Sequence, residues 1–318
     1  MYYFIVNLTS RTGKTKEIWN RLQQELDKQK IAYEAHVTEY AGHAGALADE
    51  LCTKALASMD LESEEKSDSR SCLVVVGGDG TVNEVINGMH DFDRIYFGYI
   101  PTGSGNDLGR GLRLSKDPVT ALDHILDAAE AFPMDLGIVT DGNGKKRYFA
   151  ISSGIGIDAD VCKHALTSKL KKFLNHLKLG KLTYLLLTVK ALFTMPTTEV
   201  LASFEGGEPK KIDKMIFIAG MNHPWEGGGV PMSPHADPQD GKLSVCCVYG
   251  IARGKTFFLL PLLVMGKHKI IKGFEFVDCT HYELHLKQPM VLHADGEYLG
   301  EHTNISYDCE KGKLLVLK

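Results

Sequence analysis

The chain has 318 residues, of which 44% are hydrophobic and 24% charged, which is ordinary for a globular protein long enough for two domains. Its formal net charge of −4 argues against a general nucleic-acid-binding protein, so no nucleic-acid partner is expected. The first residues carry no basic region or cleavage site, and no apolar run reaches the roughly 18 residues of a spanning helix. The seven cysteines include no C-x-x-C pair, which fits free thiols in a reducing cytosol.

The first part of the chain alternates predicted strands and helices. Residues 3–8 are predicted to form a strand, followed by a small, basic loop and a helix with one apolar face. A second strand is predicted over residues 31–38, and a second helix continues to about Met59. Residues 60–71 are polar and charged without periodicity, so we expect a surface loop there.

Residues 74–84, V-V-V-G-G-D-G-T-V-N-E, combine a buried strand with a glycine-rich turn and a helix start. We expect the glycines to allow positive φ angles and a close approach of the backbone to a ligand. The N–H groups of the helix N-terminus would face the same place. The turn therefore predicts a phosphate-binding site, in which Asp79 would hold a metal, accept a proton or bind an Arg or Lys. A tight turn with Asp79 as a helix cap is the alternative.

The same pattern returns at residues 98–110, G-Y-I-P-T-G-S-G-N-D-L-G-R, where a short apolar run leads into a loop of small residues. A further helix is predicted over residues 118–132, because Asp117 followed by Pro118 is a helix-start signal. The alternation of strands and helices predicts a parallel sheet with helices on both faces. Two such loops in one sheet are expected to line a crevice at the strand ends.

The pattern changes near Met134, after which runs with β-strand character dominate. These runs cover residues 134–140, 147–153, 200–205, 211–219 and 242–249. The sequence D-G-N-G at residues 141–144 is a hairpin signal. We therefore predict an α/β domain over residues 1–134 and a mostly antiparallel, sandwich-like β-domain over residues 135–304. The last strands, near residues 301–307 and 313–317, could complete either domain, and residues 305–318 could complete the first.

Two segments of the second half have more than one interpretation. The helical stretch within residues 158–195 places lysines between Lys163 and Lys181 among leucines. It fits either a basic amphipathic helix on an anionic membrane or an ordinary solvated helix. The apolar residues 257–264 fit the hydrophobic core, where such residues most often lie, or an acyl-chain cleft.

The two glycine motifs, G-G-D-G-T-V-N-E-V-I-N-G and P-T-G-S-G-N-D-L-G-R, together resemble the diacylglycerol kinase catalytic domain family of bacterial lipid kinases. The family is also similar to sphingosine and ceramide kinases and, more distantly, to NAD kinase. The resemblance covers essentially the whole chain and implies an N-terminal nucleotide-binding domain followed by a lipid-binding β-domain. The loop after the first strand departs from the family, because Leu8 stands at a proline position and R-T-G-K replaces the commoner form.

The resemblance implies ATP as co-substrate, held by the loops that follow the first strands. Lys14 would add positive charge near the phosphates, although an exposed lysine at a helix start is the plain alternative. Thr38 matches a family threonine that touches the nucleotide at the end of the second strand. The predicted nucleotide-binding set is Asn7, Thr12, Gly13, Lys14, Thr38, Gly77, Gly78, Asp79, Gly80, Thr81, Glu84, Thr102, Gly103, Ser104, Asn106 and Asp107.

The segment 237–242, D-P-Q-D-G-K, resembles the loop in which the family binds Mg²⁺. Asp240 would give its carboxylate, and Asp237 and Lys242 mainly their backbone carbonyls, which suits the few protein oxygens that Mg²⁺ takes. A β-turn with Asp-Gly before a strand is the alternative interpretation.

The motif D-G-E at residues 295–297 resembles the turn that supplies the family's catalytic base. We predict Glu297 as the group that takes the proton from the acceptor hydroxyl. Asp295 is the second candidate or an orienting group, and Asp79 would act in catalysis through a metal, a water or an ion pair.

These features predict an ATP-dependent kinase that phosphorylates the hydroxyl of a membrane lipid, with diacylglycerol as acceptor and phosphatidic acid as product. The alternatives are a kinase for a sphingoid base or another long-chain alcohol, a soluble enzyme similar to NAD kinase, and a nucleotide-binding regulator without catalysis. Neither a G-x-x-x-x-G-K-[ST] loop nor an H-R-D motif is present. We expect a cytoplasmic protein that contacts the inner face of the membrane peripherally, and a homodimer stays open.

Overall fold

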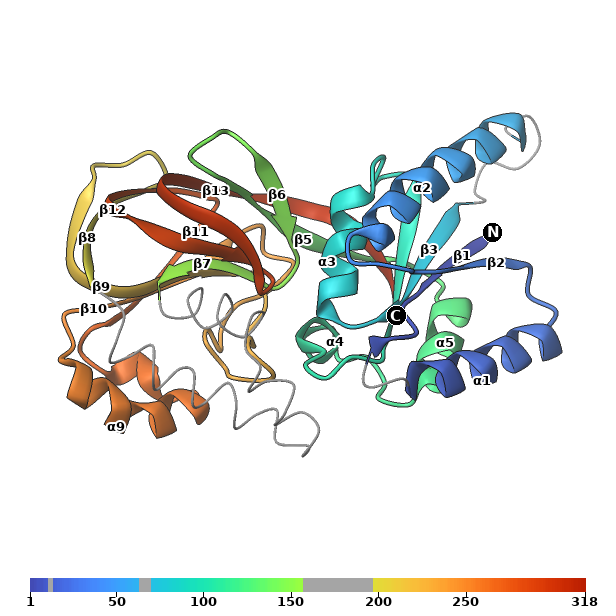
Figure 1. The fold of residues 1–318 in the computed structure, drawn as a ribbon, viewed down its shortest axis with the longest axis horizontal. Coiled ribbons are helices and arrows are strands. Elements are labelled where there is room, and N and C mark those ends of the chain that lie inside the picture. The colour runs from blue at the N-terminus through green and yellow to red at the C-terminus, as the bar shows by residue number, and fades with distance from the viewer. Residues whose placement is uncertain (11–13, 63–69, 157–196) are drawn as a thin grey trace. The chain divides into compact units, whose positions relative to one another are not determined.

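The computed structural model describes residues 1–10, 14–62, 70–156 and 197–318. Contacts between Cα atoms divide the chain into two compact units, Met1–Asp135 with Lys311–Lys318 (unit 1) and Leu136–Glu310 (unit 2). The strands β5 (Phe132–Thr140) and β13 (Glu297–Leu317) each contribute residues to both units (Figure 1). The predicted basic stretch around Lys163–Lys181, within residues 158–195, lies outside the described residues.

Unit 1 contains a parallel sheet in the order β2–β1–β3–β4, with the end of β13 paired to β4. Strand β3 is buried along its whole length, as its apolar run predicts. The strands are β1 (Tyr2–Val6), β2 (Tyr33–Val37), β3 (Ser71–Gly77) and β4 (Ile95–Pro101). The helices are α1 (Lys14–Lys28), α2 (His43–Glu62), α3 (Asp79–Gly88), α4 (Asp107–Gly111) and α5 (Pro118–Asp127).

Helices cover both faces of this sheet, which confirms the predicted α/β architecture (Figure 1). On one face, Trp19 and Leu22 of α1 and Leu122 of α5 pack on alternate strand residues such as Phe4 and Val74. The intervening strand residues point to the opposite face, because successive side chains of a strand alternate. There α2 and α3 contact each other and the sheet.

Unit 2 is built from antiparallel strands in the order β11–β10–β9–β7–β12–β13, with β8 paired to β12 and β9 and β6 paired to β5. Its core includes Tyr282 and Tyr307, whose rings stack at 4.2 Å. The remaining strands are β6 (Lys146–Phe149), β7 (Ser152–Gly156), β8 (Thr198–Phe204), β9 (Lys210–Met221), β10 (Leu243–Tyr249), β11 (Phe274–Cys279) and β12 (His281–Ala294).

The predicted β-domain is confirmed in type, and the hairpin at residues 141–144 joins β5 to β6. Two details of the prediction are wrong. The strand predicted over residues 147–153 is two strands, because the N–H groups of Ala150 and Ile151 donate to the Asp295 carboxylate instead of a neighbouring strand. The strands β11 and β12 were not predicted at all.

The apolar run 257–264 lies in helix α9 (Arg253–Val264), which leads to the short 3₁₀ helix η2 (His268–Ile270). The prediction of a core position is wrong for its end residue Val264 and for Phe258, because 61% and 76% of these side chains are exposed. Among the described residues, no helix is long and apolar enough to cross a membrane.

Candidate active site

Polar loop residues follow the carboxyl ends of the neighbouring strands β1, β3 and β4 in unit 1. The side-chain amide of Asn7, after β1, donates to the Thr81 hydroxyl in the turn after β3 at 2.9 Å. Thr38, after β2, donates its backbone N–H to Val6 O at 3.0 Å. The chain runs from β1 outward to β2 and returns to β3 on the other side of β1, so this edge is a topological switch point. Ligands of open α/β sheets bind at such points.

The two glycine loops touch through their backbones. The carbonyl of Gly77 accepts the N–H groups of Thr102 at 2.7 Å and Gly103 at 3.1 Å. A Cβ on Gly103 would lie 2.6 Å from Gly78 Cα, and a Cβ on Gly78 would lie 3.2 Å from Gly103 Cα. A side chain at either position would therefore push the loops apart.

The expected positive φ angles are wrong for the first glycine turn. None of Gly77, Gly78 and Gly80 is among the residues with positive φ, and Gly78 has a φ of −111°. A Cβ on Gly77 would instead lie 2.9 Å from the Thr81 side chain. Close packing, and not backbone conformation, therefore accounts for Gly77 and Gly78.

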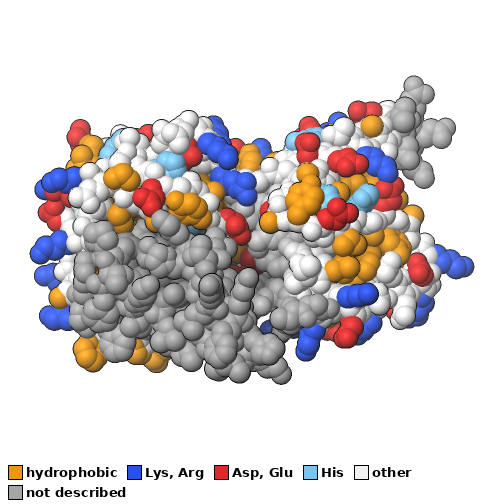
Figure 2. All heavy atoms as spheres, in the orientation of Figure 1, with side chains coloured by type: hydrophobic (Ala, Val, Ile, Leu, Met, Phe, Trp, Pro, Cys, Tyr) orange, Lys and Arg blue, Asp and Glu red, His pale blue; other side chains and the backbone are white. Residues whose placement is uncertain are grey.

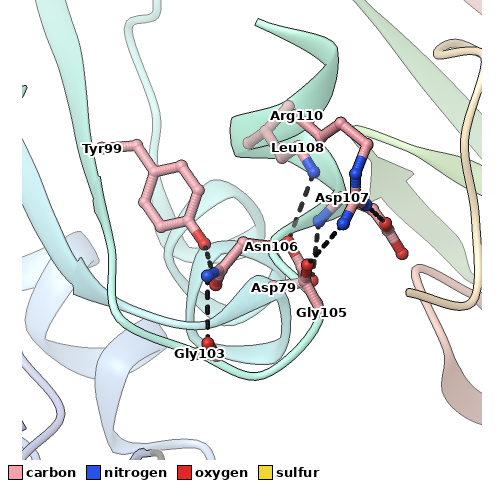
Figure 3. Close-up of polar contacts among 8 residues, drawn as sticks. All are labelled: Asp79, Tyr99, Gly103, Gly105, Asn106, Asp107, Leu108 and Arg110. Carbon is pink, nitrogen blue, oxygen red and sulfur yellow. Dashed lines mark hydrogen bonds and ion pairs between the residues drawn. The ribbon is translucent and has the colours of Figure 1, made fainter. Parts of the chain in front are cut away.

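Asp79 connects the first loop to the helix that follows the second loop (Figure 3). Its carboxylate accepts the backbone N–H of Asp107 at 3.1 Å and that of Leu108 at 3.4 Å. These two N–H groups belong to the first turn of α4, where no partner exists within the helix. Asp79 is therefore a helix cap, as the alternative interpretation held, but it caps α4 rather than its own helix.

Asn106 holds the second loop in shape from a left-handed backbone conformation with a φ of 54°. Its side-chain amide donates to Gly103 O at 3.0 Å, and its side-chain oxygen accepts the Tyr99 hydroxyl at 3.2 Å (Figure 3). Burial, and then the charges of Asp79 and Asp107, raise the pKa of Tyr99 well above its ordinary value. Tyr99 therefore stays protonated and donates its hydroxyl. The sequence analysis missed Tyr99, although its hydroxyl-bearing side chain stands shortly before the loop.

Asp107 and Arg110 form an ion pair across one turn of α4. Asp107 is buried, and Arg110 also donates to Gly105 O at 3.3 Å. The guanidinium compensates the buried carboxylate beside the Asp79 cap (Figure 3). Arg110 was part of the second motif, but the sequence analysis gave it no role.

Ser10 is a further residue that the sequence analysis missed. Its hydroxyl lies 3.0 Å from the Thr102 hydroxyl and 2.6 Å from that of Thr15, which is buried at the start of α1. The loop after β1 is thereby bonded to the second glycine loop. The signal available in the sequence was the presence of hydroxyl residues at Ser10, Thr15 and Thr102, in or directly after the loops that follow β1 and β4.

The other predicted nucleotide-binding residues occupy different surroundings. Lys14 is the exposed first residue of α1, and Ser104 is exposed in the second loop. Glu84 accepts the Ala44 N–H at 3.2 Å and so joins α3 to the start of α2. Thr12 and Gly13 lie outside the described residues.

In unit 2, Asp295 occupies the tight turn between β12 and β13. Its carboxylate accepts three backbone N–H groups, from Ala150 at 2.9 Å, Ile151 at 2.8 Å and Ser152 at 3.1 Å. Its own N–H donates to Ser152 O at 2.8 Å. This carboxylate is engaged as an anchor, so its geometry favours the orienting role over that of a base.

Glu297 is the first residue of β13, and it pairs across the hairpin with Ala294. It is partly exposed, two residues beyond the anchored Asp295. A proton acceptor must reach its donor, so partial exposure on a fixed strand end suits a general base. Of the two carboxylates of the turn, Glu297 is the better candidate.

A buried histidine supports the same turn. His293 Nδ1 accepts the Gly296 N–H at 3.3 Å, and Nε2 lies 3.5 Å from the carboxylate of Glu226, a largely buried residue. Ser153 donates its hydroxyl to His293 O at 2.6 Å. The sequence analysis missed Glu226, and it also missed His293, although His293 stands two residues before the D-G-E motif.

The loop of Asp237, Asp240 and Lys242 is an exposed turn before β10. Asp237 accepts the Gln239 N–H at 3.1 Å, and Asp240 accepts the Lys242 N–H at 2.8 Å. The predicted β-turn alternative therefore describes its local structure. In the described part of the chain, no group of three or more His, Cys, Asp or Glu could hold a metal ion. Two exposed carboxylates with backbone carbonyls still fit Mg²⁺, which takes oxygen ligands and keeps several waters.

Comparison with known proteins agrees with this architecture. Residues 1–139 match the diacylglycerol kinase catalytic domain, and residues 151–318 match the YegS C-terminal NAD kinase beta sandwich-like domain. A Bacillus subtilis (strain 168) protein named "Putative lipid kinase YtlR" is 30% identical over 301 residues, which cover 94% of each chain. The diacylglycerol kinase of the same strain is 28% identical, over 93% of this chain and 89% of that one.

The solved structure of a diacylglycerol kinase from Bacillus anthracis str. Sterne aligns with a TM-score of 0.70. The alignment covers 99% of this chain and 96% of that one at 18% identity, so it shows a shared fold alone. The parallel unit with joined glycine loops and the β-sandwich-like unit define a phosphotransferase that acts on an alcohol group. The chain belongs to the diacylglycerol kinase catalytic domain family, and it is a kinase.

Proposed function

We propose that this protein is an ATP-dependent lipid kinase that transfers the γ-phosphate of ATP to the hydroxyl of diacylglycerol, which gives phosphatidic acid. The observation that carries the proposal is the pair of glycine loops in backbone contact at the carboxyl edge of the unit 1 sheet. Small residues at such an edge let phosphate oxygens approach backbone N–H groups. The names of the two curated relatives support a lipid acceptor.

The charges around the glycine loops suit an anionic nucleotide. Asp79 and Asp107 would repel phosphate if they stood alone. The carboxylate of Asp79 binds the N–H groups of α4, and that of Asp107 is paired with Arg110. Helix N-terminal N–H groups and a guanidinium both offset negative charge. We therefore assign Asp79 a positioning role in place of the predicted catalytic one.

In the proposed reaction, Glu297 takes the proton of the acceptor hydroxyl as its oxygen bonds to the γ-phosphorus. The bond from that phosphorus to the oxygen bridging it to the β-phosphate breaks, and ADP leaves. Such transfers depend mainly on positioning and on charge compensation. Asp295 would hold the strand end that carries Glu297, through its three backbone N–H bonds.

Asp240, with the backbone carbonyls of Asp237 and Lys242, would hold Mg²⁺. When bound, Mg²⁺ supplies positive charge that compensates negative charge of the nucleotide. Each carboxylate of the loop accepts one backbone N–H, which fixes the direction of its oxygens.

We assign the nucleotide to residues 1–134, with 305–318 as a completing segment, and the lipid to residues 135–304. Since diacylglycerol resides in a bilayer, the proposal requires peripheral contact with the inner face of the membrane. Nothing in the mechanism requires a homodimer.

The test is transfer of radiolabelled γ-phosphate from ATP in mixed micelles that each contain one acceptor. The acceptors are diacylglycerol, sphingosine, ceramide and undecaprenol, and NAD is tested in plain buffer. Label in phosphatidic acid alone is the expected result. Label in another lipid alone would overturn the acceptor, label in NADP would overturn the lipid assignment, and label in none would overturn the proposed reaction.

A further inference from the structure

The segment from helix α9 to η2 in unit 2 is a surface feature that the proposed catalytic groups do not use. It follows β10 and precedes β11, and Figure 1 shows α9 beneath the strands of its unit. The helix ends at Val264, and the chain turns at Gly266, whose φ is 66°, while Lys267 donates its N–H to Leu262 O at 2.8 Å. This left-handed termination fixes the direction in which η2 leaves the helix.

Large apolar side chains of this segment face solvent. The most exposed are Ile270, Phe258, Val264 and Met265, with 90%, 76%, 61% and 59% of their surface accessible. In the orientation of Figure 1, Figure 2 shows hydrophobic side chains at the lower edge of the molecule, where α9 lies. A helix that is apolar all round is normally buried in a core or in lipid. Four large exposed apolar side chains within residues 258–270 indicate an interaction surface.

The inner side of the segment is firmly packed, so its outer side is a fixed surface. Leu263 packs against the core cluster that contains Phe217 and Val248. The buried His268 donates its Nε2–H to Met232 O at 3.0 Å, and the centre of its ring lies 5.2 Å from that of Phe274. Anchoring His268 inward leaves its neighbours Lys267, Lys269 and Ile270 on the outside.

The charge of the segment has one sign. Residues 251–274 contain no Asp or Glu. Four exposed lysines, Lys255, Lys267, Lys269 and Lys272, surround the apolar residues. Lysines beside exposed apolar side chains complement a surface with an apolar interior and anionic headgroups.

We propose that the outer side of α9 and η2 is the surface by which this protein docks on membranes rich in anionic phospholipid. Ile270, Phe258, Val264 and Met265 enter the headgroup boundary, and the four lysines bind the headgroups. The 12 residues of α9 are far fewer than the roughly 20 that span a bilayer, so the helix lies at the interface. The inference rests on the proposed lipid substrate for its purpose, but its test does not depend on activity.

The first experiment is co-sedimentation of the full chain with vesicles that contain phosphatidylglycerol, compared with pure phosphatidylcholine vesicles. The wild-type chain is expected to bind the anionic vesicles at least about tenfold more tightly, because each lysine near an anionic surface contributes about fivefold. The double variant Phe258→Asp/Ile270→Asp is expected to bind them at least about tenfold more weakly than wild type. Equal binding of the variant and the wild type would overturn the proposal.

Matched variants separate this surface from general effects. Leu201→Asp places the same charge on another exposed apolar residue of unit 2, and it is expected to bind vesicles like wild type. Lys267→Glu/Lys269→Glu tests the charge without altering apolar residues and is expected to lose the preference for anionic vesicles. Lys287→Glu, on exposed Lys287, is its control. Loss of binding in both controls would overturn the assignment to α9 and η2.

Two further measurements separate membrane docking from catalysis and from self-association. Phosphorylation of a short-chain, water-soluble diacylglycerol by Phe258→Asp/Ile270→Asp is expected to match wild type, while phosphorylation in vesicles falls. If no acceptor is phosphorylated but vesicle binding follows the variants, the proposed function fails and the docking surface stands. Sedimentation velocity tests self-association. If the wild-type chain is a dimer, and Ile270→Asp dissociates it without changing vesicle binding, the surface would be assigned to contact with a second copy instead.

Discussion

The Asp79 region of unit 1 and the Asp295 region of unit 2 use the same device for different purposes. In each region, one carboxylate collects backbone N–H groups from a segment distant in sequence, residues 107–108 for Asp79 and residues 150–152 for Asp295. Around Asp79 the result is a pair of loops made of small residues, suited to an anionic ligand. Around Asp295 the result is a fixed hairpin end that carries Glu297.

The difference shows which carboxylates are able to do chemistry. Backbone N–H groups that donate to a carboxylate stabilise its ionised form and hold it in place, so a carboxylate with two or three of them is a poorer proton acceptor. Glu297 and Asp295 are both partly exposed, so the turn separates them only by the three backbone N–H groups that Asp295 accepts, and those that Asp79 and Asp295 accept favour a positioning role for these two. Five substitutions test these carboxylates, the contact between the glycine loops and the Mg²⁺ loop, beginning with the one expected to cost the most activity.

Replacing Glu297 by Gln keeps its shape and removes the proton acceptor. We expect the turnover number with diacylglycerol in mixed micelles to fall by about 100-fold or more, which is the usual contribution of a general base. ATP affinity, measured by titration calorimetry, should stay unchanged. Glu301→Gln, four residues further along β13, is the control and should retain activity. Near-normal turnover of Glu297→Gln would return the role of base to Asp295 or Asp79.

Gly103→Ala tests whether contact between the loops forms the nucleotide site. The added Cβ would lie 2.6 Å from Gly78 Cα, so the loops must separate, and ATP binding should weaken by about tenfold or more. Gly78→Ala, with a contact of 3.2 Å, should weaken it less. ATP titration of both variants gives the order. Equal affinity of both variants and the wild type would remove the nucleotide from this edge of the sheet.

Asp295→Asn replaces an acceptor oxygen by an N–H donor that faces backbone N–H groups. We expect the free energy of unfolding to fall by about 1–3 kcal/mol, the usual cost of a buried polar group left without its partner. Activity should fall by about tenfold through displacement of Glu297. The free energies of unfolding of Asp295→Asn and Glu297→Gln, measured with denaturant, are compared. The comparison separates loss of the anchor from loss of the base. A stability equal to wild type for Asp295→Asn would contradict the anchoring role.

Asp79→Asn should loosen the joint between the first loop and α4. We expect the KM for ATP to rise by about fivefold, with a smaller change in the turnover number, since one of two N–H bonds is lost. Asp117→Asn is the matched control, because Asp117 caps α5 through Thr120 N at 2.9 Å. It should lower stability slightly without altering the KM for ATP. A large fall in turnover at saturating ATP would instead support the catalytic role predicted from the sequence.

Asp240→Ala should have the smallest effect. We expect activity to fall by only a few-fold and to be partly restored by excess Mg²⁺, because Mg²⁺ sites with few protein ligands bind weakly. Activity as a function of Mg²⁺ concentration gives the measurement. An unchanged Mg²⁺ dependence would remove the metal from this loop.

Local signals were enough to predict unit 1. The strands β1, β3 and β4 and the glycine turns follow directly from short apolar runs and small residues, and their carboxyl ends meet because parallel strands in one sheet end at one edge. The glycine motifs also identified the family. The positive φ angles expected for the first glycine turn were wrong, and the packing between Gly78 and Gly103 was missed because it joins two loops that are distant in sequence.

Unit 2 was harder to predict because its contacts are long-range. The break between β6 and β7 depends on a carboxylate 143 to 145 positions away, which no local pattern contains. The exposure of Ile270 and Phe258 follows from which side of α9 packs on the sheet, and an apolar helix shows no preferred side in its sequence.

The sequence by itself determined the fold class, the family and the residues from which a site can be built, because short-range periodicity and motif chemistry are local properties. Only the tertiary structure decided which groups the carboxylates of Asp79 and Asp295 contact. Asp79 and Asp295 read alike in their motifs as acidic residues beside glycine, and Glu297 stands beside one of them. Folding brings backbone N–H groups of other segments to the two aspartates, and these bonds depend on positions in space and not on neighbours in the chain.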